Sequence, residues 1–146
     1  MKVEIKKEYV FDEVEKISAY IGAKKGRYNE VVITVEEHEA LAPFWSAGCG
    51  AVIEMLKKFA TGCSSLNTHH AMGDIEIFEI TLNAPHITEN TAQLITSNIT
   101  LFLINYISSQ WLNITSPEDA KKYSDICIAK EREIVRLAYY RPMPIK

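Results

Sequence analysis

The sequence predicts a mainly helical protein with a small β-hairpin, a four-helix bundle-like fold in the order helix, helix, hairpin, helix, helix. Apolar residues recur at helical spacing in four separate stretches. A run rich in β-forming residues, Ile75–Leu82, follows the turn-like sequence Met72-Gly73-Asp74. The segment from Asn90 to Pro117 carries no charged residue and no histidine, as expected of a helix buried on most sides.

The first eight residues fit either a short edge strand or an irregular lead-in, because Val3 and Ile5 alternate with charged residues. From Val10 onward, apolar residues fall at i, i+4, i+7 and i+11, which predicts the first helix. Gly22 is a plausible end for that helix, because glycine favours helix termini.

A capping box formed by Thr34 and Glu37 predicts the start of the second helix. Pro43 conflicts with a continuous helix, because proline removes one backbone hydrogen bond. We therefore expect a kink, or a restart with Pro43 in the first turn. Gly48 and Gly50 lower helix propensity, so we expect a neighbouring element to approach closely there.

The hairpin is expected near residues 63–83, and its second strand does not alternate cleanly. Phe78, Ile80 and Leu82 would point to one face, whereas Ile75 and Ile77 would point to the other. Either both faces are covered near the start of the strand, or a bulge switches the face midway.

Clear start signals precede the last two helices. Thr88 can cap the charge-free third helix. Ser116 offers a second cap, followed by Pro117 at the first helical position and by two acidic residues that the helix dipole favours. The fourth helix is expected to end at Arg141-Pro142 and to leave a short apolar tail.

The bulk properties favour a single helical domain over residues 1–146, with the hairpin as an insertion. The net charge of −3 gives no reason to expect nucleic-acid binding. Three cysteines without a CxxC spacing indicate reduced thiols of a cytoplasmic protein. The charge-free segment is long enough to span a membrane, but polar residues interrupt it, so we expect no membrane association.

Catalytic motifs are lacking, so we expect no enzyme and no cofactor. The chain has no H-E-x-x-H zinc motif, no G-x-S-x-G elbow and no glycine-rich phosphate loop. His69, His70 and His86 could be considered for metal binding. However, His69 and His70 are adjacent, and adjacent residues on a strand point to opposite faces, so we expect polar surface residues and not metal ligands. His38 lies among glutamates in a predicted first turn, which favours a solvated cap over an acid–base pair. Cys49 has no local histidine, which favours packing over nucleophilic catalysis.

Three segments resemble parts of small helical proteins found among the structural genes of bacterial prophages, near tail and head–tail joining components: Ile17–Lys24, Pro43–Phe59 and Arg132–Lys146. They make up a minority of the chain and contain no catalytic motif. The resemblance implies a virion-assembly or scaffold role, and it assigns no role to any residue.

We therefore expect a non-enzymatic structural or assembly subunit, cytoplasmic or virion-associated, that forms homo-oligomers or joins other assembly subunits. The alternative is a small-ligand-binding module or enzyme with a pocket between helices and hairpin, lined by Trp45, Trp111 and Tyr123. The sequence leaves open whether the chain itself or another subunit covers the charge-free segment. The candidate contact residues are Phe78, Ile80, Phe102, Tyr106, Trp111, Tyr140 and Met143.

Overall fold

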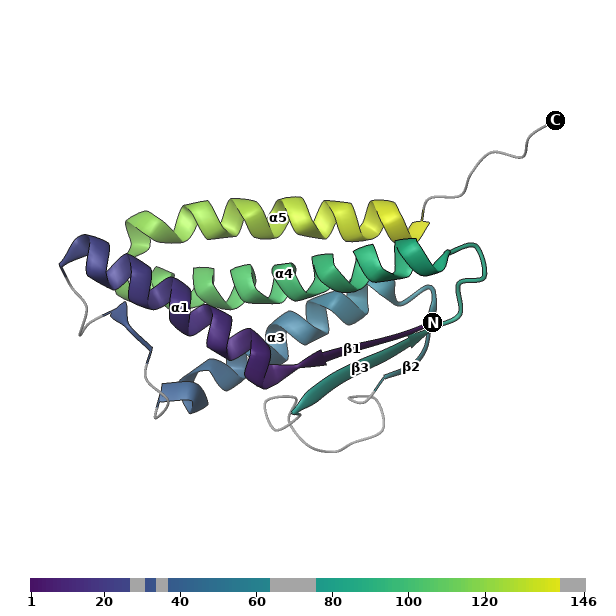
Figure 1. The fold of residues 1–146 in the computed structure, drawn as a ribbon, viewed down its shortest axis with the longest axis horizontal. Coiled ribbons are helices and arrows are strands. Elements are labelled where there is room, and N and C mark those ends of the chain that lie inside the picture. The colour runs from purple at the N-terminus through teal and green to yellow at the C-terminus, as the bar shows by residue number, and fades with distance from the viewer. Residues whose placement is uncertain (27–30, 34–36, 64–75, 140–146) are drawn as a thin grey trace.

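The computed structural model describes residues 1–26, 31–33, 37–63 and 76–139. The described part is mainly helical, as predicted, with a small antiparallel sheet (Figure 1). Its elements, in chain order, are β1 (Lys2–Lys6), α1 (Lys7–Lys25), α3 (His38–Leu56), β2 (Ala60–Cys63), β3 (Ile77–Leu82), α4 (Glu89–Thr115) and α5 (Pro117–Tyr139).

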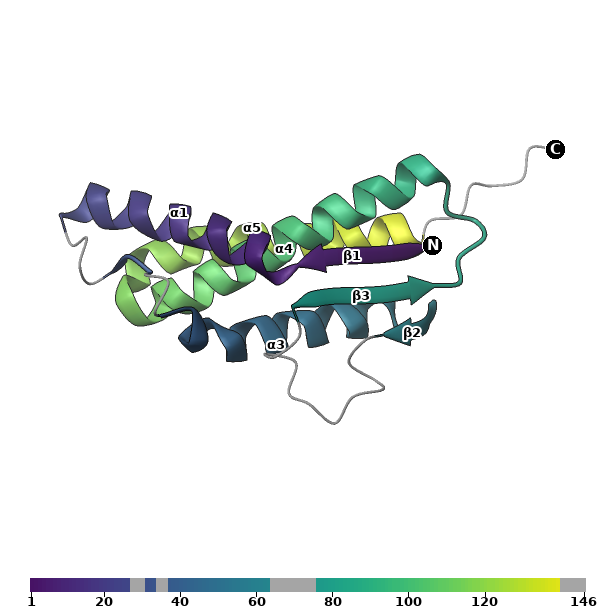
Figure 2. The ribbon, with the colours of Figure 1, turned by 60° about the horizontal axis from the view of Figure 1, so that its bottom comes forward.

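Helix α4 lies at the centre of the arrangement. α5 runs back along it after a one-residue connection at Ser116, and α1, α3 and β1 also contact it. In Figure 1, α1 passes in front of the C-terminal part of α4, and no described element passes in front of its N-terminal part. Figure 2 shows α3 beside the sheet, below α1 and α4. The buried apolar residues of all these elements form one cluster.

The sheet has three strands in the order β1-β3-β2, with both pairs antiparallel. β2 and β3 pair as predicted, but the simple hairpin is wrong, because the N-terminal strand adds to the other edge of β3. Val3 lies opposite Ile80, and Ile5 lies opposite Phe78. All four side chains are buried, so this apolar pairing explains why the ambiguous N-terminal segment forms a strand.

Strand β3 alternates strictly between exposed and buried residues over its whole length. Ile77 is exposed, whereas Phe78, Ile80 and Leu82 are buried. Neither the doubly covered start nor the mid-strand bulge occurs within these residues. The irregularity lies instead in β2, between Ala60 and Gly62. Residue 75 and the predicted turn at 72–74 lie outside the described residues.

The predicted end of the first helix at Gly22 and the predicted restart of the second helix at Pro43 are both wrong. α1 passes through Gly22 and ends before Gly26, whose φ of 65° is the left-handed conformation that glycine adopts readily. α3 runs through Pro43 without interruption. The carbonyl that Pro43 leaves without its helical partner belongs to Glu39, an exposed residue, so water can hydrate it. α3 begins at His38, and the predicted cap residue Thr34 lies outside the described residues.

The predicted starts of α4 and α5 are confirmed. Thr88 Oγ1 accepts a hydrogen bond of 3.3 Å from the Thr91 amide at the start of α4. α5 begins at Pro117, directly after Ser116. The Ser116 hydroxyl donates to the Asp119 carboxylate at 2.7 Å, and the Asp119 amide donates to the Ser116 carbonyl at 2.9 Å.

Helices α3 and α4 approach each other closely at Gly48, as predicted. A Cβ atom there would lie 2.9 Å from Leu103 Cδ2 and 3.2 Å from Tyr106 Cδ1. The same prediction is wrong for Gly50, where a Cβ atom would meet nothing within 4 Å among the described residues. Only Gly48 is therefore needed for the packing of the two helices.

Candidate interaction surface

The C-terminal half of α4 is enclosed by its own chain. Between Phe102 and Leu112, only Tyr106 and Gln110 are less than fully buried. α1, α3 and α5 all contact α4, and together with the connecting residues 31–33 they supply the cover. The absence of charge in this half is therefore explained within one molecule.

Polar side chains in this half find partners mainly on their own helix. Asn105 Nδ2 donates to the Leu101 carbonyl at 2.7 Å, and Ser109 Oγ donates to the Tyr106 carbonyl at 2.8 Å. Buried amide and hydroxyl groups are costly only when they lack hydrogen bonds. Ser108 Oγ is the one buried side-chain oxygen without a partner among the described residues.

Trp111 joins α4 to the connecting segment 31–33. Its Nε1 donates to the Val31 carbonyl at 2.6 Å, and the amide of Ile33 donates to Ser18 Oγ on α1 at 3.0 Å. Val31 and Ile33 are both buried. These bonds fix the segment against α1 and α4, which closes this end of the core.

The N-terminal half of α4 leaves one face uncovered. Leu94 is 54% exposed and Leu101 is 41% exposed, and Gln93 and Ser97 are exposed beside them. We call these four residues the α4 face. They lie at three- and four-residue spacing, so they share one side of the helix.

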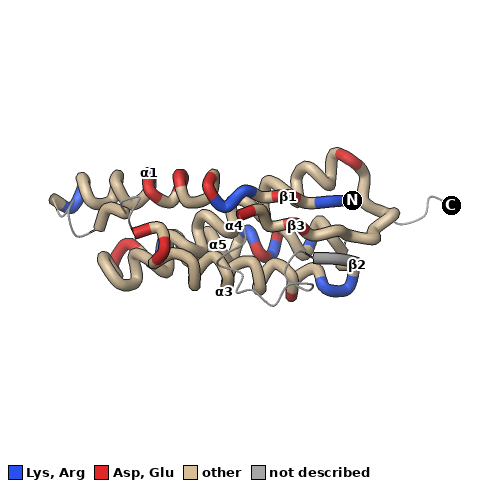
Figure 3. Tube along the Cα trace, turned by 90° about the horizontal axis from the view of Figure 1, so that it is seen from below, with Lys and Arg blue, Asp and Glu red and all other residues tan. Residues whose placement is uncertain are grey.

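The α4 face carries no charged residue. The single charged residue of α4 is Glu89, in the first turn. In Figure 3, acidic and basic positions mark α1, β1 and β3. Isolated apolar side chains on a surface are normal, but exposed leucines on a helix side without any charge are typical of an interaction site.

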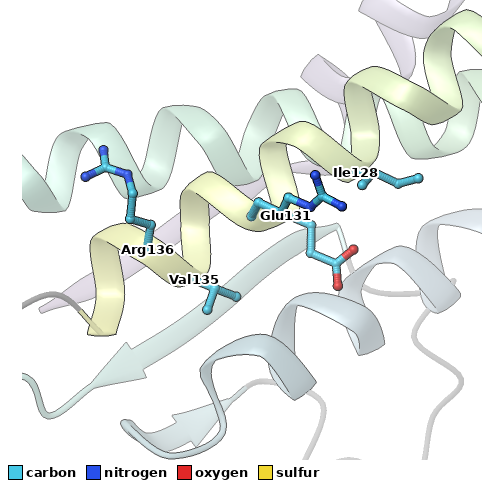
Figure 4. Close-up of a pocket in the computed structure, with 5 residues that line it drawn as sticks. Ile128, Glu131, Val135 and Arg136 are labelled. Carbon is cyan, nitrogen blue, oxygen red and sulfur yellow. The ribbon is translucent and has the colours of Figure 1, made fainter.

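A hollow lies on α5 (Figure 4). Its volume is about 460 Å³, and its lining residues all come from this one helix. Ile128 is 45% exposed and Val135 is 37% exposed. Arg136 is already paired with Glu133 at 2.5 Å. The lining residues are Ile128, Glu131, Arg132, Val135 and Arg136.

Most of the predicted contact residues lie inside the protein's own core. Phe78 and Ile80 are fully buried, and Phe102 and Trp111 are nearly so. These large apolar side chains fill the space between sheet and helices, where the rings of Phe78 and Trp45 meet edge to face. Tyr106 is half-buried against Gly48.

The remaining two predicted contact residues, Tyr140 and Met143, lie outside the described residues. The described chain therefore leaves little of the predicted set for a partner. Leu94 and Leu101, which are exposed, were not among the predicted contact residues, although both belong to the charge-free segment that the sequence singled out.

The histidines that the structure describes have protein partners. His86 Nε2 lies 2.8 Å from the Ala138 carbonyl, which can only accept, so the ring nitrogen donates to the end of α5. His38 Nε2 lies 2.5 Å from Glu15 Oε1 and links α3 to α1. His38 therefore forms a half-buried carboxylate pair and is not a solvated cap.

His69 and His70 lie outside the described residues. In the described part of the chain, no three His, Cys, Asp or Glu side chains are grouped in a way that could hold a metal ion.

The described cysteine side chains are packed inside the protein. Cys49 and Cys127 are buried. Burial raises the pKa of the Cys127 thiol to about 11, and the nearby Glu131 carboxylate adds to the effect. A raised thiol pKa opposes nucleophilic reactivity, because the thiolate is the reactive form.

Both thiols are expected to resist modification in the folded protein. With a pKa of about 11, only about one Cys127 thiol in a thousand is ionised at pH 8, against about one in four for an ordinary cysteine. A Cys63→Ser variant restricts the readout to Cys49 and Cys127. Labelling with a chromogenic disulfide should be slow in buffer and complete in guanidinium chloride. Rapid labelling in buffer would contradict the burial of these side chains.

Comparisons with protein-family models, with curated proteins and with solved structures find no match to this chain. Among the described helices, none combines the length and the hydropathy that a membrane span requires.

Proposed function

We propose that this protein is a non-catalytic structural or assembly subunit that self-associates through the α4 face. One observation carries the proposal: Leu94 and Leu101 are half-exposed on a helix side that has no charged residue. The enclosed C-terminal half of α4 needs no partner. The uncovered N-terminal half has no equivalent cover within the described chain, which is the situation that association resolves.

The expected strength of this association follows from the area involved. Fully burying a leucine contributes about 1.5–3 kcal/mol, so the exposed half of each leucine contributes about 1 kcal/mol. Two copies would bury four leucines, which offsets only part of the cost of bringing two molecules together. The association should therefore be weak and dependent on concentration.

Other functions have less support in the described residues. Trp45, Trp111 and Tyr123, the candidate lining of a ligand pocket, are buried in the core. Two hollows among the described residues lie on α5 and at the α4–α5 connection, away from the sheet. A role in prophage virion assembly, with other assembly subunits as partners, is compatible with self-association and stays a prediction from resemblance.

Lysine at both leucines of the α4 face is expected to abolish self-association. The wild-type protein should show species above its monomer mass of 16.6 kDa at high micromolar concentration in sedimentation equilibrium. The Leu94→Lys/Leu101→Lys variant should stay monomeric, because four ammonium groups would meet in the contact. Its melting temperature should change little, since both side chains reach water.

Ile114→Lys is the matched control for that experiment, because Ile114 is 69% exposed near the other end of the same helix. This control should associate like the wild type. A wild-type protein that stays strictly monomeric at every concentration would overturn the proposal.

A further inference from the structure

We infer that the hollow at the α4–α5 connection binds a small organic acid, a carboxylate that also carries hydroxyl groups. This inference goes beyond the proposed self-association and does not depend on it. The hollow is lined by the last two turns of α4 and the first two turns of α5, which lie side by side after the one-residue connection (Figure 1). Its volume is about 250 Å³. We call it the α4–α5 hollow.

Polar side chains make up most of the lining of the α4–α5 hollow. They come from both helices, and none of them is a carboxylate: Ser109, Gln110, Asn113, Lys121 and Ser124. Ser109 is more than nine-tenths buried, and its hydroxyl donates to the Tyr106 carbonyl at 2.8 Å. The oxygen of that hydroxyl can still accept a hydrogen bond from a ligand.

The two amides of the hollow differ from other amides on the same helix. Asn98 and Asn105 each donate to the carbonyl four residues earlier, at 2.8 and 2.7 Å. Gln110 and Asn113 make no such bond, and neither has another hydrogen-bond partner among the described residues. Their amide nitrogens are therefore available to donate to a ligand, and their amide oxygens are available to accept from it.

Lys121 gives the hollow a positive charge. It is the one charged residue of the lining, and it forms no ion pair with a described residue. The carboxylates of Glu118 and Asp119, in the first turn of α5, do not line the hollow. They lie 3.5 and 3.7 Å from the Nζ atom of Lys25 on α1. A carboxylate in the hollow would pair with the Lys121 ammonium group without a competing acidic side chain in the lining.

The remaining lining residues favour an organic anion over an inorganic one. Pro117 and Ala120 offer apolar contact to a short carbon skeleton, but too little for a hydrophobic ligand. The hydroxyl and amide oxygens of the lining accept hydrogen bonds from ligand hydroxyl groups, which sulfate does not have. With one ammonium group in a hollow open to water, we expect weak binding, with a dissociation constant on the order of 1–10 mM.

A nuclear magnetic resonance titration with malate, citrate and gluconate tests the inference. The side-chain amide signals of Gln110 and Asn113 should shift with at least one of these acids and reach saturation. Sodium sulfate at matched ionic strength should leave both signals in place, because it screens charge equally but has no hydroxyl group. The variants Gln110→Met and Asn113→Leu assign the two signals, since each removes one amide.

Lys121→Gln should weaken the binding of that acid about tenfold, because it removes the charged donor of the hollow. Lys122→Gln is the matched control. It removes the same charge from the next residue, which lies about 100° around the helix and does not line the hollow. This control should bind like the wild type. Circular dichroism melting establishes that both variants are folded.

Three results would contradict the inference. Signals that stay in place with all three acids would overturn it, and so would equal weakening of binding by the two lysine variants. Equal shifts with sulfate would show that the hollow accepts any anion, which contradicts an organic acid as its ligand. None of these results affects the proposed self-association, which sedimentation equilibrium measures independently.

Discussion

Lysine at Ile107 is expected to unfold the protein, whereas lysine at Leu101 on the same helix is expected to leave it folded. Ile107 is fully buried, and Leu101 is 41% exposed. An ionised side chain in the core loses its hydration without gaining a partner, which costs several kcal/mol of a total stability of about 5–15 kcal/mol. At Leu101 the ammonium group remains in water. Far-ultraviolet circular dichroism and urea unfolding measure both outcomes.

Ile107→Met is the matched control for that comparison. A swap that nearly conserves volume should reduce the free energy of unfolding by less than about 1.5 kcal/mol, so this variant should remain folded. If Ile107→Lys melted within a few degrees of the wild type, the C-terminal half of α4 would not be enclosed as described.

Gly48 and Gly50 are expected to respond to substitution with opposite signs. Valine at Gly48 would force its side chain against Leu103 and Tyr106, where even a Cβ atom lies 2.9 Å from Leu103 Cδ2. We expect a loss of about 2–3 kcal/mol in the free energy of unfolding, as for other overpacked cores. Alanine at Gly50 meets open space among the described residues and should stabilise α3 by about 0.5–1 kcal/mol.

Urea denaturation of Gly48→Val and Gly50→Ala measures the change in the free energy of unfolding of each variant. Gly50→Val serves as the control for the helix propensity of valine. Gly50→Val should change stability by less than 1 kcal/mol in either direction, since no described neighbour obstructs it. Equal destabilisation by valine at both positions would show that α3 and α4 do not approach closely at Gly48.

Local signals predicted the starts of the last two helices well. Thr88 and Ser116 act through atoms within a few residues, so their role does not depend on the rest of the fold. The helix breaks at Gly22 and Pro43 failed because each costs only a few kcal/mol locally. Burial of α1 and α3 against the core outweighs that cost, and sequence periodicity does not measure such burial.

For β1, the local sequence left open the choice between an edge strand and an irregular lead-in. Val3 and Ile80 pair across about half of the chain, and only the assembled fold brings them together. The choice of candidate contact residues met a related difficulty. Phe78 and Ile80 are large and apolar, which predicts contact but does not distinguish a contact within the chain from one between subunits.

The charge-free segment indicated enclosure correctly between Phe102 and Leu112, but not at Leu94 and Leu101. The segment lacks charge along its whole length, whereas the burial of its residues differs between its two halves. Which residues of α4 stay exposed therefore depends on how the other elements pack around it, a property of the fold and not of the segment itself.

Sedimentation equilibrium of the wild-type protein in low and high salt tests self-association through an uncharged face most directly. Raising the salt concentration from about 0.1 M to about 1 M shortens the Debye length from about 10 Å to about 3 Å and weakens contacts made by exposed charges. We predict a reversible association whose dissociation constant stays the same or decreases as salt increases. A protein that is monomeric in both buffers, or an oligomer that dissociates in high salt, would contradict the account.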